Sequence, residues 1–185
     1  MKGIVYTLFQ DMVEEEFGLE VWEHLLEHSS LPSEGIYTSV KTYPDEEIVE
    51  LITQLSAHSG TPAPDLIEHF GHYLLPNLMA TLPAMISRYH DLWSFLGAID
   101  DVIHMEVQKL NPDALTPEIK VIEHHGDQMD VSYKSPRKLC FLAIGLIKQA
   151  GIHFNTPVDV THKQCMHDDH QHCVLSITLS EPIYA

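Results

Sequence analysis

The chain has 185 residues, the length of one domain or of two closely joined subdomains, and its hydrophobic fraction of 44% excludes global disorder. Asp and Glu number 27 against 10 Lys and Arg, which gives a formal charge of -17 and excludes binding to nucleic acid or anionic membranes through the general field. The acidity is concentrated in residues 1–91, which contain 15 acids and three bases. No segment approaches the ~20 apolar residues of a membrane span, and the N-terminus lacks the pattern of a signal peptide, so a cytoplasmic location is expected.

The first 110 residues are predicted to be mainly helical, because apolar residues recur at three- and four-residue spacing. Asp45 is expected to cap one of these helices, and Pro76 and Pro83 are expected to kink or split another. The strongest helical pattern is the last one, which predicts a single continuous helix up to Asn111. Helices are predicted over residues 3–17, 20–28, 45–58, from about 65 onward, and 92–110.

After Pro117 the periodicity changes to that of strands. A helix over residues 139–150, ended by Gly151, is expected between two pairs of strands. The strands are predicted over residues 119–123, 129–133, 158–161 and 174–179, with a hairpin turn at 124–127. The pattern predicts one α+β domain, with a helical subdomain over about 1–62 and an α/β subdomain with an antiparallel sheet over about 63–185.

The sequence Tyr133-Lys134-Ser135-Pro136-Arg137 places two hydroxyls and a guanidinium on one face of an extended chain. An arginine can bind a carboxylate through two parallel hydrogen bonds while hydroxyls donate to the remaining lone pairs. Such a row suits a ligand with carboxylate groups. By spacing alone, the same residues are also typical of a solvated strand edge.

His104 lies in the helical pattern of residues 92–110, on a face with Gly97 and one of the acids Asp100 and Asp101. A neutral imidazole on an otherwise apolar helix can be an axial iron ligand, and Gly97 would leave room for a flat macrocycle. One of the two acids would then orient the imidazole. The alternative is a core histidine that bonds a backbone carbonyl.

Taken together, these features resemble the heme–nitric oxide/oxygen binding (H-NOX) family. The ordered features that carry the resemblance are Met1-Lys2-Gly3 before an apolar helix, Gly71 inside a helix, Asp-Asp-Val-Ile-His ending at His104, Pro117, and Tyr-x-Ser-x-Arg ending at Arg137. The resemblance covers nearly the whole chain. It implies a b-type heme held without covalent bonds between a helical distal subdomain and an α+β proximal subdomain.

The resemblance also implies roles for single residues. His104 would be the axial iron ligand, and Pro117 would press on the porphyrin and distort it. Tyr133, Ser135 and Arg137 would hold the heme propionates. Nitric oxide would weaken or break the bond between iron and His104, so that the heme and the two subdomains relax.

The choice of gas rests on the distal pocket. Oxygen-binding members of the family place a tyrosine five residues beyond the arginine, where this chain has Leu142, with Leu146 on the same apolar stretch. Bound oxygen is held by a hydrogen-bond donor, whereas nitric oxide and carbon monoxide bind without one. We therefore expect a nitric oxide sensor, unless Tyr6 or Tyr73 reaches the iron and makes the protein an oxygen sensor.

The three cysteines form a second candidate site together with a histidine. His162-x-x-Cys165 has the spacing of metal ligands, and Cys173 returns across a predicted hairpin. Cys140 lies three residues after Arg137, where a helix is predicted beside the sheet. A Cys3His zinc site is predicted, with His162 as the first choice of histidine and His170 as the second. The alternative is a solvated turn with incidental cysteines, and thiol oxidation remains open when zinc is absent.

The expected cofactors are therefore heme b and zinc, and the expected activity is sensing and not catalysis. By the resemblance, the partner is a separately encoded histidine kinase or cyclic-di-GMP enzyme, with no role for nucleic acid or membrane. Two other classes stay open: a zinc or thiol redox sensor in which heme is secondary, and a heme enzyme such as a peroxidase or oxygenase.

Overall fold

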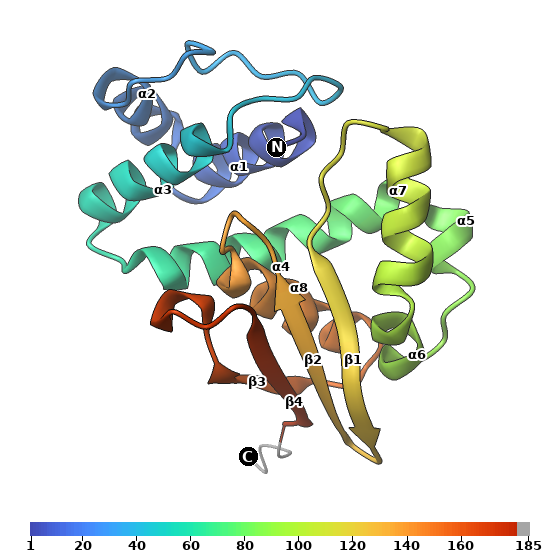
Figure 1. Cartoon of the computed structure of the whole chain (residues 1–185). Helices are drawn as coiled ribbons and strands as arrows, with labels where there is room; N and C mark the ends of the chain where they lie inside the picture. The colour runs from blue at the N-terminus through green and yellow to red at the C-terminus, as the bar shows by residue number, and fades with distance from the viewer. Residues whose placement is uncertain (181–185) are drawn as a thin grey trace.

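The computed structural model describes residues 1–180 and has the α+β architecture that the sequence predicts (Figure 1). Three N-terminal helices lie on one side of a long fourth helix, and a four-stranded sheet with one covering helix lies on the other. Within residues 1–180, no helix combines the length and the apolar character needed to cross a membrane.

The N-terminal helices are α1 (Gly3–Glu16), α2 (Leu19–His28) and α3 (Asp45–Ser59), which agree closely with the predicted ranges. Their apolar stripes meet the first half of α4 (Ala63–Thr81), because the helical spacing puts every third or fourth apolar residue on one face. Phe9 of α1 packs edge-to-face on Phe70 of α4 inside this core.

The break predicted in the fourth helix occurs only at the second proline. Helix α4 continues through Pro76 and ends at Thr81, and the short helix α5 (Pro83–Ile86) follows. Pro76 removes one backbone donor, but the residues around it are packed in the core and the helix persists. At Pro83 the preceding residue leaves the helical region, as expected for the residue before a proline.

The prediction of one continuous helix over residues 92–110 is wrong. The segment consists of α6 (Leu92–Gly97), the π-helix η1 (Ile99–His104) and α7 (Met105–Leu110). A π-helix has more residues per turn than an α-helix, and such segments occur often at functional sites. Apolar spacing could not predict it, because the pattern within each short piece still fits an α-helix.

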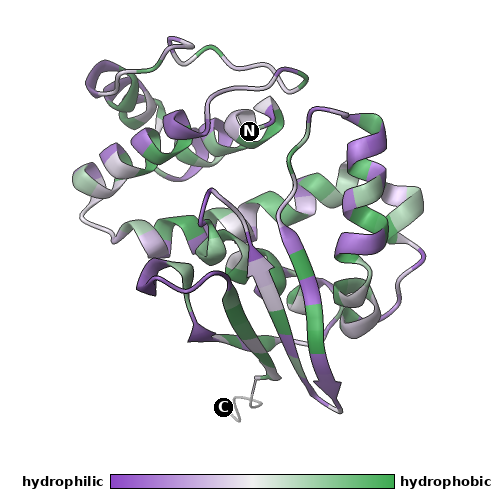
Figure 2. Cartoon of the chain, in the orientation of Figure 1, coloured by the Kyte–Doolittle hydropathy of each residue, from purple (hydrophilic) through white to green (hydrophobic). Residues whose placement is uncertain are grey.

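The sheet contains β1 (Glu118–His125), β2 (Gln128–Lys134), β3 (Val158–Gln164) and β4 (Cys173–Leu179) in the order β1-β2-β4-β3, all antiparallel. Central strand β4 is almost uniformly apolar, whereas edge strand β1 alternates (Figure 2). The β1–β2 turn is tighter than predicted, since the strand includes His125 and the turn is Gly126-Asp127, with Gly126 at φ 57°.

Helix α8 (Cys140–His153) links β2 to β3 and packs on the sheet. It does not end at Gly151 as predicted, since Gly151 lies within the helix, where a Cβ would come 2.7 Å from the Thr156 carbonyl oxygen. Helix α8 also crosses α4 closely, because a Cβ at Gly145 would lie 1.9 Å from the Glu68 carbonyl oxygen. The two helices therefore pack backbone against backbone where they cross. This crossing connects the N-terminal core to the sheet.

Candidate functional site

A cavity of about 810 Å³ lies between the N-terminal helices, α4 and α8 on one side and η1, α7 and the sheet on the other. Its volume is typical of a site that encloses a cofactor-sized molecule. Most of its lining is aliphatic, with a few polar groups. Seven of the residues that the sequence associates with the heme line this cavity: His104, Pro117, Tyr133, Ser135, Arg137, Leu142 and Leu146.

His104 is the last residue of η1, and only 17% of its side chain is exposed. Burial lowers the pKa of this imidazole, and the Asp100 carboxylate, with an oxygen 3.2 Å from Nδ1, partly offsets the effect. A neutral ring that donates its Nδ1–H to Asp100 leaves Nε2 as a ligand atom. The predicted role of Gly97 is wrong in its geometry, because η1 intervenes and Gly97 does not line the cavity.

Arg137 connects three parts of the chain at the edge of the cavity. Its Nη1 donates a hydrogen bond to the Leu115 carbonyl oxygen at 2.7 Å, in the loop that leads to Pro117. Its Nε lies 2.7 Å from an Asp45 carboxylate oxygen, in a geometry that makes an ion pair and not a linear hydrogen bond. Tyr133 and Ser135 beside it are almost completely buried.

Asp45 also binds the N-terminal ammonium of Met1, with a distance of 2.6 Å to its second oxygen. Burial alone would raise the pKa of the Asp45 carboxyl, but the ammonium and Arg137 outweigh burial and lower it. The sequence predicts Asp45 only as a helix cap, and that prediction is wrong, since the cap position is Pro44. No local pattern could reveal the ion pairs, because their partners lie 44 and 92 positions away in the sequence.

Tyr6 and Tyr73, which the sequence left open as donors to a distal ligand, are engaged elsewhere. The Tyr6 hydroxyl donates to the Pro44 carbonyl, and the Tyr73 hydroxyl donates to Glu15 at 3.0 Å. Neither residue lines the cavity, whereas Leu142 and Leu146 do. The α8 wall of the cavity is therefore aliphatic where these two leucines face it.

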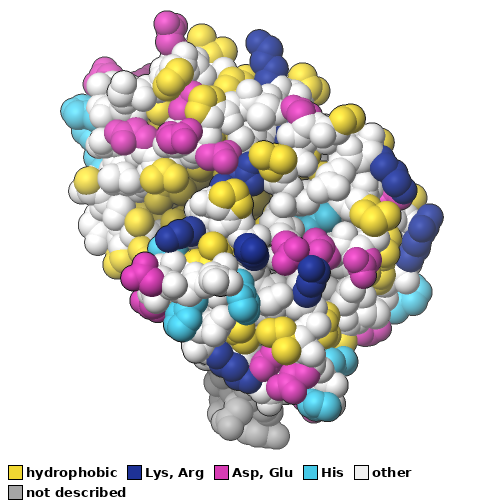
Figure 3. Space-filling model, viewed as in Figure 1, with side chains coloured by type: hydrophobic (Ala, Val, Ile, Leu, Met, Phe, Trp, Pro, Cys, Tyr) yellow, Lys and Arg dark blue, Asp and Glu magenta, His cyan; other side chains and the backbone are white. Residues whose placement is uncertain are grey.

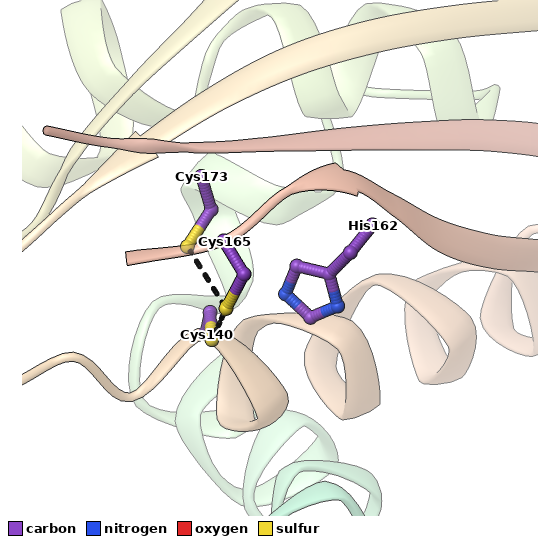
Figure 4. Close-up of side chains that lie close together, drawn as sticks. All are labelled: Cys140, His162, Cys165 and Cys173. Atoms are coloured by element: carbon purple, nitrogen blue, oxygen red, sulfur yellow. Dashed lines mark hydrogen bonds between the residues drawn. The ribbon is translucent and has the colours of Figure 1, made fainter. Parts of the chain in front are cut away.

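A second cluster lies where α8 begins, beside β3 and β4. Cys140, His162, Cys165 and Cys173 present ligand atoms that all lie within 4.8 Å of one another (Figure 4). The Cys165 sulfur is 3.8 Å from that of Cys140 and 3.9 Å from that of Cys173. A tetrahedral zinc ion with bonds of ~2.3 Å to sulfur would hold two thiolates about 3.8 Å apart.

The surroundings of this cluster also fit a metal. The three thiols are buried and unbridged, and burial together with their mutual proximity raises the pKa of Cys140. Burial, and then His167, lower the pKa of His162, and its Nε2 is buried without a hydrogen-bond partner in residues 1–180. A cation would remove the repulsion among thiolates and give Nε2 a partner. His170, the second-choice ligand, is exposed and lies outside the group.

The cavity fits the class of domains that hold a heme without covalent bonds, since it combines an apolar interior, one largely buried imidazole and an arginine with two hydroxyls. The comparisons with known proteins agree. A family model described as Haem-NO-binding matches residues 2–162. No curated protein matches the chain.

Several solved structures are similar over the full length. The unliganded Fe(II) H-NOX protein from K. algicida is 32% identical, with a TM-score of 0.92, and the match covers 100% of both chains. The H-NOX protein from S. oneidensis in the Fe(II)NO state is 34% identical, with a TM-score of 0.91 over 98% of this chain and 100% of that one. The S. oneidensis domain in the Fe(II)CO state is also 34% identical, with a TM-score of 0.86 over 98% of this chain and 99% of that one. The chain belongs to the H-NOX family, whose domains bind heme.

Proposed function

We propose that this protein is a nitric oxide sensor that holds heme b in the cavity around His104. The observation that carries the proposal is the pairing of one largely buried imidazole, supported by an acid, with an aliphatic wall formed by Leu142 and Leu146. A relative from S. oneidensis has been solved with NO and with CO on Fe(II). Heme supplies a ferrous iron that takes up such diatomic gases, and an aliphatic wall suits NO and CO better than oxygen.

The chain's own residues would hold the heme in defined ways. His104 would supply the nitrogen that binds the iron, and Asp100 would fix its tautomer. Tyr133, Ser135 and Arg137 would bind the propionates. Pro117, at the end of the loop that Arg137 holds through Leu115, would bear on the macrocycle.

Signalling follows from the position of His104 in the π-helix. If the contact between His104 and the iron were lost, η1 would lose its anchor, and the part of the chain from about residue 63 onward would shift against residues 1–62. A separate partner reads this shift through different affinities for the two states. The partner class that the family resemblance supports is a histidine kinase or a cyclic-di-GMP enzyme. The proposal is of a sensor and not of an enzyme.

We also propose a structural zinc ion bound by Cys140, His162, Cys165 and Cys173. The sulfur separations and the unpartnered Nε2 of His162 support it. A second candidate function, a zinc or thiol redox sensor, is favoured by the position of Cys140 only three residues after Arg137. Loss of zinc or oxidation of the thiols would then disturb the arginine that binds the propionates.

The test of the main proposal is the visible spectrum of the reduced protein with and without NO, and again under air. The unmodified protein should bind NO and CO and form no stable complex in air. His104→Gly should lose the axial ligand, and free imidazole should restore it, whereas His125→Ala, at an exposed strand end, should change nothing. An unchanged ferrous spectrum of His104→Gly without imidazole would contradict the assignment.

A further inference from the structure

Three histidines meet on the surface of the N-terminal helices, far from both sites described above. His24 and His28 lie one turn apart on α2, with ring centroids 4.0 Å apart, and His58 near the end of α3 lies 4.6 Å from His24. His28 and His58 are exposed and His24 is partly exposed. Figure 3 shows histidine side chains (cyan) at the edge of the molecule, over α2 and α3.

The spacing of the first two is that of a helical chelate, because residues four apart lie on one face of a helix and can bind the same ion. His28 Nδ1 lies 2.9 Å from the carbonyl oxygen of His24, so this nitrogen carries the hydrogen and donates it. The lone pair of His28 is then on Nε2, free for a ligand bond. His58 adds a third imidazole from a second helix.

The local electrostatics favour neutral imidazoles that bind a metal cation over three protonated imidazoles. Burial, then the proximity of His28 and His58, lower the pKa of His24, with Glu27 acting in the opposite direction. Neutral imidazoles are the form that binds metals. Residues 1–91 contain 15 acids and three bases, and acidic side chains (magenta) are frequent on this side of the molecule (Figure 3), so the field attracts divalent cations.

We propose that His24, His28 and His58 form a surface site for a late divalent transition metal, of the class of Ni²⁺, Cu²⁺ and Zn²⁺, which prefer imidazole nitrogen. In the described conformation the His24 and His28 rings stack at 29°, and the His58 ring is tilted by 49° from that of His24, so binding turns the rings to point their nitrogens at one ion. Exposed side chains change rotamer within nanoseconds, so this rearrangement is accessible. The bound ion would join α2 to α3.

The test is isothermal titration of Ni²⁺ into the untagged, heme-loaded protein after its zinc content has been measured. We expect a saturable event of one Ni²⁺ per chain. His28→Ala and His58→Ala should each weaken it by at least about tenfold, because even loss of an outer partner of a metal ligand costs about 10–100-fold in affinity. Ni²⁺ should also raise the melting temperature of the unmodified protein but not of His58→Ala.

Two controls separate this site from other histidines and from the thiols. His125→Ala removes an exposed histidine on the β1 strand and should leave the event unchanged. The reactivity of the three buried thiols should not change when Ni²⁺ binds, so the result does not depend on whether the Cys3His group binds zinc. No saturable binding at millimolar Ni²⁺, or binding that survives both His28→Ala and His58→Ala, would overturn the proposal.

Discussion

The cavity and the thiol cluster differ in how completely the folded chain prepares them for a cofactor. Around the cavity, residues from most elements of the fold enclose about 810 Å³, and His104 is the one histidine among these lining residues. In the cluster, four ligand atoms from α8, β3, β4 and the turn between these strands already lie within 4.8 Å of one another. The thiol cluster thus already has the arrangement of a four-ligand site, whereas the cavity is a large enclosed space with one histidine in its lining.

For the proposed sensor we infer that the part around η1 is compliant and the sheet is rigid, so that a ligand shifts the equilibrium between two arrangements of these parts. The compliant part includes η1, where His104 sits in a π-helix between two short helices. The rigid part is the sheet, whose central strand β4 carries Cys173. The two parts meet at the short segment from Arg137 to Cys140, where Arg137 binds Asp45 of the N-terminal helices and Cys140 begins α8.

The largest expected effect comes from breaking the rigid site. Cys165→Ala should abolish zinc binding and destabilise the C-terminal sheet, because a structural zinc can contribute about 10–16 kcal/mol to folding. Elemental analysis and thermal melting measure the two parts of this prediction. His170→Ala should retain the zinc and His162→Ala should lose it. Zinc-free protein with three freely titrating thiols and full stability would contradict the site.

The next largest effect concerns the propionates. Arg137→Ala should cost about 2–5 kcal/mol of heme-binding free energy. The substitution leaves a heme propionate without its charged partner at a position where the arginine side chain is largely buried. The rate of heme transfer to an acceptor protein measures the loss. Arg137→Lys keeps the charge but not the planar fork and should be intermediate. Unchanged heme retention in Arg137→Ala would show that the arginine serves only to join the chain segments.

A smaller effect tests the aliphatic wall. Leu142→Tyr introduces a hydroxyl into the cavity and should raise oxygen affinity by about tenfold, since one neutral hydrogen bond contributes about 1–1.5 kcal/mol. Leu142→Phe has a similar size without the hydroxyl and should not. Spectra of the reduced variants under air distinguish them. A stable oxygen complex of the unmodified protein would mean that another group already donates a hydrogen bond to the bound oxygen.

Much of the fold was predictable because its signals are local. The spacing of Phe9 and Val13 predicts α1, and the alternation around Val131 predicts β2, since these residues are buried in the periodic positions that the patterns indicate. The π-helix was not predictable, because what distinguishes it is its backbone hydrogen bonding and not its residue types. The helix end predicted at Gly151 was wrong for a related reason. Glycine is typical of helix ends, but here the missing side chain lets the Thr156 carbonyl oxygen lie close to the side of the helix.

The candidate sites divide in the same way. The thiol cluster was predictable because only three cysteines exist and two flank one hairpin. Tyr133, Ser135 and Arg137 were predictable as a row, since they follow one strand into its end. The bond from Arg137 to Asp45 was not predictable from residue patterns, since only the folded chain brings α3 next to the segment after β2.

The smallest expected effect concerns the ion pair between Asp45 and Arg137. Asp45→Asn keeps the shape of the side chain but weakens its interactions with the N-terminal ammonium and Arg137. Because about a third of the Asp45 side chain is exposed, the loss of unfolding free energy at pH 7 should be only about 1 kcal/mol.

The pH dependence of this loss identifies its origin. The folded state lowers the pKa of Asp45, so the stabilisation is fully present above the unfolded value of about 3.9 and is lost as the pH falls through the lower folded value. The difference in urea midpoint between Asp45→Asn and the unmodified protein should therefore be constant from pH 7 down to about pH 5 and shrink below about pH 4. Asp159→Asn, at an exposed position of β3, is the matched control and should produce no comparable difference. If the Asp45→Asn difference persists unchanged at the lowest pH, the effect comes from packing and not from the carboxylate that joins the two parts of the molecule.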